Sequence, residues 1–225
     1  MPLRNACFVS YRHGQYELMR EFTRDLCAAL RSELEAMLNV GGIFLDDDRL
    51  KGGDFYNQAL ARNLYESATM VMVYTPTYFD SVHTYCTREY KAMLALERDR
   101  LSRLRLSGLG NHGLIIPIVL RGASYLPDEI KAARLYHNFE SFQLGGRRLS
   151  RHPRFAPVIR QIATYICDRY LELQSLPEDV FQAHEQFSLP DETEIRSFLS
   201  IAAGFKMPFP RGGISCAPPS LPARP

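Results

Sequence analysis

Residues 69–75 read Thr-Met-Val-Met-Val-Tyr-Thr, a run that is apolar almost throughout and ends at Pro76. A strand with one face in water alternates apolar and polar residues, whereas a strand covered on both faces does not. Similar runs occur at 6–11 (ACFVSY), 43–45 (IFL) and 114–120 (LIIPIVL). These runs therefore predict a parallel sheet that is buried on both faces.

Helical periodicity fills the intervals between these strands. Large apolar residues recur at about every fourth position from Leu18 to Leu38, and further helices are expected at 55–67, 85–104, 127–134 and 155–170. A fifth strand, interrupted by polar residues, is expected at 135–142. Alternating strands and helices with right-handed crossovers favour a doubly wound, five-stranded parallel α/β sheet with helices on both faces. Ligands of such sheets bind beyond the carboxyl ends of the strands.

Composition excludes several function classes. The 225 residues carry a formal net charge of +2, which argues against a dedicated nucleic-acid-binding protein. We find no apolar run of membrane-spanning length and no signal-peptide pattern, so we expect a cytoplasmic protein with no membrane partner. The five cysteines are scattered without metal-type Cys/His spacing, so we expect reduced thiols and no metal site.

The chain divides by composition into three parts. Residues 1–174 hold the strands and helices of one folded domain. Residues 175–203 predict a helical C-terminal extension, with helices near 177–186 and 191–203, the second opened by acidic residues at 190–194. Residues 204–225 are rich in Pro and Gly and predict a flexible tail or linker. We expect residues 175–225 to dock a sensor protein, unless the chain is part of a larger one.

The helix beginning near Tyr85 carries a pair of residues that suits ligand binding. Tyr85 and Glu89 are four residues apart and share a helix face, and an apolar stripe that includes Cys86, Tyr90 and Met93 is expected to pack separately. An aromatic ring can stack on a flat heterocycle while the carboxylate one turn later faces a sugar. Such pairs on helices are also common and inert, so the pair alone decides nothing.

Two further segments reach the same edge of the predicted sheet. Arg12 follows the first strand and is either a solvated strand cap or a partner for a diphosphate. The polar loop 46–54, with Gly52 and Gly53 at its far end, is either a surface loop or a mobile lid. Phe55, which follows the loop, either anchors the next helix in the core or lines a pocket.

In this order, the segments resemble a TIR domain over about residues 5–170. The first box of the family resembles Phe8-Val9-Ser10-Tyr11-Arg12, and the second resembles Phe44-Leu45-Asp46 with Leu50, Gly53 and Phe55. The third-strand segment of the family resembles residues 71–78. The segment that bears the glutamate of enzymatic members resembles Ser81 with Tyr85-Cys86-Thr87-Arg88-Glu89.

The resemblance implies a flavodoxin-like fold and, in a bacterial-type enzymatic member, cleavage of the nicotinamide–ribose bond of NAD+. By position, Glu89 would be the catalytic carboxylate, and the substrate pocket would be lined by Tyr11, Arg12, Asp46, Gly53, Phe55 and Tyr85. NAD+ would be a substrate, and no cofactor is expected. The resemblance also implies self-association and a role as an immune or antiphage effector.

Three functions stay open on the sequence. The first is this NAD+ nucleosidase, with ADP-ribose or a cyclic isomer as product. The second is a non-catalytic TIR adaptor that mediates assembly in signalling, with Glu89 as a solvated helix residue. The third is a nucleoside-processing enzyme on a similar sheet, such as a deoxyribosyltransferase relative. The order of the TIR-like segments favours the first two, and the Glu89, Tyr85 and Arg12 set favours the enzyme.

Overall fold

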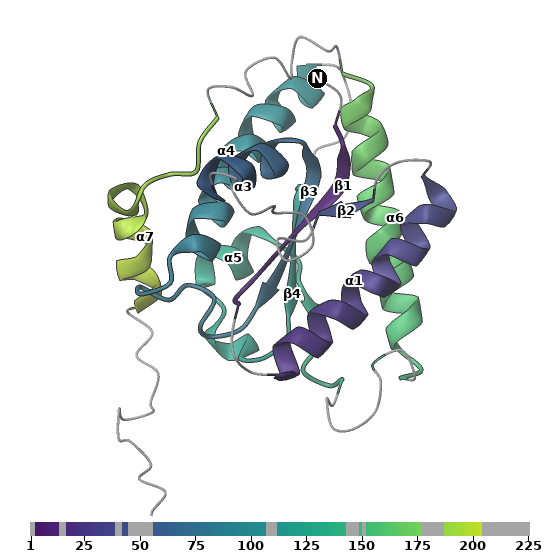
Figure 1. The fold of residues 1–225 in the computed structure, drawn as a ribbon, viewed down its shortest axis with the longest axis horizontal. Coiled ribbons are helices and arrows are strands. Elements are labelled where there is room, and N and C mark those ends of the chain that lie inside the picture. The colour runs from purple at the N-terminus through teal and green to yellow at the C-terminus, as the bar shows by residue number, and fades with distance from the viewer. Residues whose placement is uncertain are drawn as a thin grey trace, which may run out of the picture.

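The strands form one sheet with helices on either side (Figure 1). The computed structural model describes residues 3–13, 17–38, 42–44, 56–106, 112–142, 149, 152–176 and 187–203. The elements, in chain order, are β1 (Asn5–Tyr11), α1 (Glu17–Met37), β2 (Ile43–Phe44), α3 (Tyr56–Tyr65), β3 (Ser67–Tyr74), α4 (Tyr85–Leu106), β4 (Ile115–Val119), the 3-10 turn η1 (Ala123–Tyr125), α5 (Asp128–Ala133), β5 (His137–Asn138), α6 (Phe155–Gln174) and α7 (Glu192–Ala203).

All five strands run parallel in the order β2-β1-β3-β4-β5. Helices α1 and α6 lie together on one side of the sheet, and α3 and α4 lie on the other (Figure 1). This arrangement confirms the predicted doubly wound, flavodoxin-like sheet with helices on both faces. Three of the apolar runs identified in the sequence form the central strands β1, β3 and β4, and the run at 43–45 supplies the edge strand β2. β1 and β3 are buried along their whole length.

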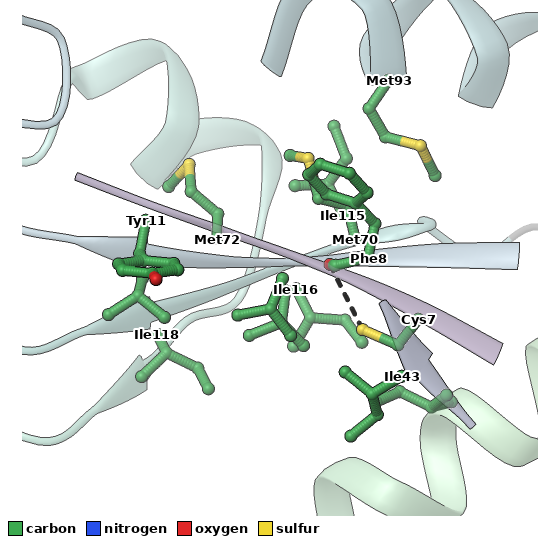
Figure 2. Close-up of a cluster of buried hydrophobic side chains, with 14 of the residues drawn as sticks. Cys7, Phe8, Tyr11, Ile43, Met70, Met72, Met93, Ile115, Ile116 and Ile118 are labelled. Carbon is green, nitrogen blue, oxygen red and sulfur yellow. Dashed lines mark hydrogen bonds between the residues drawn. The ribbon is translucent and has the colours of Figure 1, made fainter. Parts of the chain in front are cut away.

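The two faces of the sheet have separate apolar layers (Figure 2). Phe8 and Met70 point toward Met93 of α4, while Cys7 and Ile116 point to the opposite side. Phe8 also stacks on Phe44 of β2, with ring centroids 5.3 Å apart. Because side chains alternate along a strand, Ser10 shares the α4-facing side of β1 with Phe8. The sequence thus directs one hydroxyl of an otherwise apolar strand at helix α4.

The last strand is much shorter than the sequence predicts. We expected a strand at 135–142, but β5 covers only His137–Asn138. The side-chain oxygen of Asn138 accepts a hydrogen bond from the Glu140 backbone N–H at 2.8 Å. Such a turn ends an edge strand, and Glu140 then accepts hydrogen bonds from the backbone N–H groups of Gly122 and Ala123.

The segment 187–203 packs against α4. Its helix α7 begins with a capping box: Asp191 accepts the backbone N–H of Glu194 at 2.9 Å, and Glu194 accepts that of Asp191 at 2.7 Å. The ring of Phe198 lies 5.0 Å from that of Phe79. The helix predicted at 177–186 and the tail 204–225 lie outside the described residues. Within the part of the chain that is described, no helix is long and apolar enough to span a membrane.

Candidate functional site

The sheet reverses its direction of winding between β1 and β3. The chain leaves β1 toward β2 and leaves β3 toward β4, so the two connections diverge from adjacent strands. In such sheets, ligands bind between the carboxyl ends of these two strands. Two side-chain contacts cross that point. The hydroxyls of Ser10 and Tyr78 are 2.5 Å apart, and Arg12 lies 3.3 Å from Asp80.

Glu89 is brought to the same place by helix α4. This helix follows β3, so its first turns lie at the carboxyl edge of the sheet and its last turns at the amino edge. Ser10 donates a hydrogen bond of 2.6 Å to Glu89 Oε2. Only 5% of Glu89 is exposed, so its carboxylate lies within the fold beside the switch point. A buried carboxylate requires hydrogen-bond donors, and Ser10 is one of them.

Ser10 is the centre of a small hydrogen-bond network, which we call the Ser10 network and define as Ser10, Tyr78 and Glu89. A serine hydroxyl can donate one hydrogen bond and accept two. Because Ser10 donates to Glu89, the Tyr78 hydroxyl must be the donor to Ser10. The Tyr78 proton therefore points to the Ser10 oxygen, and the Ser10 proton points to the carboxylate.

Burial keeps Tyr78 of this network and the neighbouring Cys86 thiol protonated. It raises the pKa of Tyr78 well above its usual value, and Cys86 and Glu89 act in the same direction. Burial and then Glu89 raise the pKa of Cys86, against a lowering by Arg12. A thiol in this state is a poor nucleophile. Neither the Tyr78 hydroxyl nor the Cys86 thiol is therefore a candidate nucleophile at this place.

Arg12 follows the carboxyl end of β1, next to the switch point, and forms an ion pair with Asp80. The ion pair is partly exposed, with 21% of the Arg12 side chain and 29% of the Asp80 side chain accessible. The other carboxylate oxygen of Asp80 accepts the Val82 backbone N–H at 3.0 Å, which fixes the acid. An anionic ligand that binds Arg12 must therefore compete with a carboxylate already in place.

Tyr85 lies one turn before Glu89 and is 40% exposed. Its ring meets that of Tyr56 edge to face at 5.1 Å, and the Arg88 guanidinium carbon lies 5.3 Å from its centroid. Glu89, four residues after Tyr85, is much less exposed than Tyr85 and is buried like Cys86 and Met93.

The structure brings some of the predicted site residues together and separates others. Glu89 and Arg12 lie at the two contacts that cross the switch point, and Tyr85 lies at the surface one turn from Glu89. Tyr11 is buried and stacks on His13 at 4.4 Å, and strand alternation places it on the side of β1 opposite to Ser10. Three further predicted residues, Asp46, Gly53 and Phe55, lie outside the described residues. No group of three or more potential metal ligands occurs among the described residues.

Two residues of the network, Ser10 and Tyr78, had no assigned role in the sequence analysis. Ser10 carries a detectable signal, because a hydroxyl in a strand buried on both faces needs a partner on the helix that covers it. Tyr78 carries no such signal. It lies in the turn after β3, where its N–H bonds to the Thr75 carbonyl at 2.9 Å, and its proximity to Ser10 depends on the register of β1 and β3.

Helix α4 carries two other buried charges, and both have structural partners. Glu97 accepts the backbone N–H groups of Leu114 and Ile115, at the start of β4. Arg100 donates to the carbonyls of Ser67 and Tyr65, at the start of β3 and the end of α3. Both thus satisfy backbone groups at the amino edge. Glu89, at the carboxyl edge, accepts a hydrogen bond from the Ser10 side chain.

The comparisons with known proteins gave one match. A family model described as TIR domain matches residues 7–150, which hold β2 to β5, α4 and the Ser10 network. No curated protein and no solved structure matches the chain.

Proposed function

The chain belongs to the TIR domain family, and on this premise we propose that it cleaves the nicotinamide–ribose bond of NAD+, with Glu89 as the catalytic carboxylate. The observation that carries the proposal is the position of Glu89. Its carboxylate is buried beside the switch point of the sheet, where doubly wound folds bind ligands, and Ser10 holds it at 2.6 Å.

The proposed reaction needs little from the protein. Ordinary glycosidases supply a general acid because the leaving alkoxide must be protonated. Nicotinamide leaves from a cationic pyridinium and becomes neutral, so no proton donor is required. The transition state then carries positive charge on the ribose. A fixed anion beside the sugar stabilises this charge, and a well-placed group of this kind contributes about 3 kcal/mol or more.

The remaining site residues supply binding in this proposal. Arg12 exchanges Asp80 for the diphosphate of NAD+, and the exposed part of the Tyr85 ring stacks on a flat ring, which contributes about 1 kcal/mol. Tyr11, Asp46, Gly53 and Phe55 are assigned to the pocket by the resemblance alone. We propose NAD+ as a substrate and no bound cofactor.

Burial of Glu89 has a consequence for activation. With 5% of the residue exposed, a ribose reaches the carboxylate only after the surrounding groups move. We propose that self-association of TIR domains drives this opening, so that an isolated chain is idle and an assembled one is active. On this proposal the protein is a cytoplasmic immune or antiphage effector.

The C-terminal segment offers a route for regulation by a partner. Arg88, the residue before Glu89, donates a 2.6 Å hydrogen bond to the carbonyl of Pro190. A sensor protein that bound residues 187–203 would therefore act on the helix that carries the carboxylate. A pull-down with the full chain and with a chain that ends at residue 176 tests this partner. Equal capture by both chains would contradict it.

An adaptor without catalysis is the second candidate. The solvated Glu89 expected for this alternative is contradicted, because only 5% of the residue is exposed. The observation that favours an adaptor is instead this burial, because a carboxylate enclosed in the single chain and bonded to Ser10 also suits a purely structural role. On this alternative, the protein assembles and recruits partners but leaves NAD+ intact.

The deciding experiment follows nicotinamide release from NAD+ by the full chain, with and without a crowding agent that promotes assembly. We expect Glu89→Gln to reduce the rate about a hundredfold or more. Asp99→Asn is the matched control, because Asp99 lies on the same helix with 52% of its side chain exposed. If wild type and Glu89→Gln release nicotinamide equally, or if neither does so when assembled, the proposal fails.

A further inference from the structure

The Ser10 network joins three elements that are far apart in the chain. Ser10 belongs to β1, Tyr78 to the turn after β3, and Glu89 to the second turn of α4. The Ser10 hydroxyl lies 2.5 Å from the Tyr78 hydroxyl and 2.6 Å from Glu89 Oε2. Ser10 and Tyr78 are both fully buried. Short contacts between buried groups on three elements hold a side chain in one orientation.

The backbone beneath this network is fixed by the sheet. Ser10 pairs with Met72 in the register of β1 and β3, so its Cα cannot shift without breaking the central ladder. Tyr78 is held by the hydrogen bond of its N–H to the Thr75 carbonyl and by the ring of Phe79, whose centroid is 4.8 Å away. Ser10, which donates to Glu89, and Tyr78, which contacts Ser10, are therefore positioned before any ligand arrives.

The network does not lead to solvent at its Tyr78 end. Tyr78 is fully buried, so a proton passed along the hydroxyls from Glu89 would stop inside the fold. A role of the two hydroxyls in proton release is thereby disfavoured. The Ser10 proton that points toward Glu89 instead stabilises the charged form of the carboxylate and fixes its direction.

Other titratable groups lie close to the network. Cys86 lies on the same helix, and Glu89 and Arg12 act in opposite directions on the pKa of its thiol. Arg12 is itself paired with Asp80, and Glu89 and Tyr90 both raise the pKa of Tyr78. The 2.6 Å hydrogen bond to Glu89 Oε2 comes from Ser10.

We propose that Ser10 and Tyr78 are positioning residues for Glu89, which hold it ionised and aimed at the switch point for the reaction. This inference rests on the proposed NAD+ cleavage for its catalytic meaning, but the network itself is measurable without activity. Neither residue contacts the reacting atoms. Ser10 acts on Glu89 directly, and Tyr78 acts through Ser10 by fixing which way the serine proton points.

Three single variants of the full chain separate positioning from packing. Ser10→Ala removes the direct donor. Tyr78→Phe removes only the outer hydroxyl and keeps the ring. This variant should fold, so it tests the network even if Ser10→Ala does not fold. Tyr74→Phe is the matched control, because its hydroxyl bonds at 2.6 Å to the Tyr125 carbonyl in the same region but lies outside the network.

The first measurement is the titration of the Glu89 carboxyl in protein labelled with carbon-13 at the glutamate carboxyl, with the signal assigned by its loss in Glu89→Gln. We expect Ser10→Ala to move the midpoint to higher pH by about one unit. Tyr78→Phe should move it the same way by less, and Tyr74→Phe should leave it in place. The second is NAD+ cleavage, in which the acid limb of kcat should follow these midpoints while KM changes by less than about twofold.

The outcomes are distinguishable. An unchanged midpoint in both Ser10→Ala and Tyr78→Phe overturns the inference, whether or not NAD+ is cleaved. Moved midpoints with a wild-type chain that does not cleave NAD+ support the network but overturn the proposed function. Moved midpoints together with a moved acid limb support both. A loss of folding stability with an unmoved midpoint would show that the residues only pack.

Discussion

Replacing Glu97 by Gln should destabilise the fold strongly, although the substitution changes one atom. Glu97 Oε1 accepts the backbone N–H of Leu114 at 2.5 Å and a hydrogen bond from Arg134 at 2.8 Å, and its other oxygen also pairs with Arg134. Only 6% of the Glu97 side chain and 11% of the Arg134 side chain are exposed. Solvent therefore cannot replace a lost partner.

The magnitude follows from the charge that would be left behind. A glutamine would turn an NH2 donor toward the Arg134 guanidinium, which has only donors. Breaking a buried ion pair from one side costs about 3–5 kcal/mol, because the remaining charge is uncompensated. Arg134→Met combined with Glu97→Gln removes that charge, so the double variant should lose at least about 2 kcal/mol less than the sum of the single variants.

Urea unfolding followed by circular dichroism measures these free energies for the wild type, the two single variants and the double variant. The free energies of the four proteins can be compared if their m-values are the same. Additive losses, within about 0.5 kcal/mol, would refute the coupling. A loss below about 1 kcal/mol for Glu97→Gln would refute the assigned burial cost. Glu89→Gln belongs in the same series, and we expect it to lose much less, because the glutamine carbonyl still accepts the hydrogen bond from Ser10.

Two further predictions concern alkaline pH and the C-terminal segment. Burial raises the pKa of Cys7 to about 12, with hydrogen bonds to Thr69 and Val71 acting against it. Its protonated thiol therefore stabilises the fold fully below pH 9.0, the usual value, and this contribution is lost as pH rises toward 12. Between pH 8 and 10.5, the free energy of unfolding measured with urea should fall more steeply with pH for the wild type than for Cys7→Ala. The same pH dependence in both proteins would contradict this. Phe198→Ala should release residues 187–203 from α4, because a buried Phe contributes about 3 kcal/mol. Amide hydrogen exchange in residues 187–203 should rise in this variant. It should not rise in the control variant Leu135→Ala, whose side chain is exposed.

The central part of the fold was predictable because its signal is local. Strands β1, β3 and β4 are apolar without alternation, and this pattern requires cover on both faces whatever else the chain contains. The edge strand β5 was predicted too long. Its end depends on Glu140, whose carboxylate binds the backbone N–H groups of Gly122 and Ala123 rather than continuing the ladder. The contact between Glu140 and Gly122 joins residues 18 positions apart, so the local pattern of apolar residues does not reveal it.

The candidate site was predictable in its location but not in its construction. Topology alone brings Arg12 and Glu89 to one edge of the sheet, as the sequence analysis expected. The burial of Glu89 was missed, because the periodicity of α4 was judged from its apolar residues. The partner that allows this burial, Ser10, is 79 residues away in the chain. Long-range polar partners decide which charged residues of a helix turn inward, and only the folded structure shows them.

The buried charges of α4 follow from the geometry of a helix that crosses a whole sheet. Glu89, Met93, Glu97 and Arg100 lie at spacings of four, four and three residues, so they form one stripe that faces the sheet. Met93 meets the apolar middle, where no polar partner exists, and Glu97 and Arg100 meet backbone groups at the amino edge. These backbone partners belong to the fold itself, and the Arg134 side chain adds an ion pair to Glu97. At the carboxyl edge Glu89 is held by the Ser10 side chain, which a single substitution removes without breaking the ladder. Stability and the proposed chemistry therefore depend on opposite ends of one helix, so variants of Glu97 should test the first and variants of Ser10 the second.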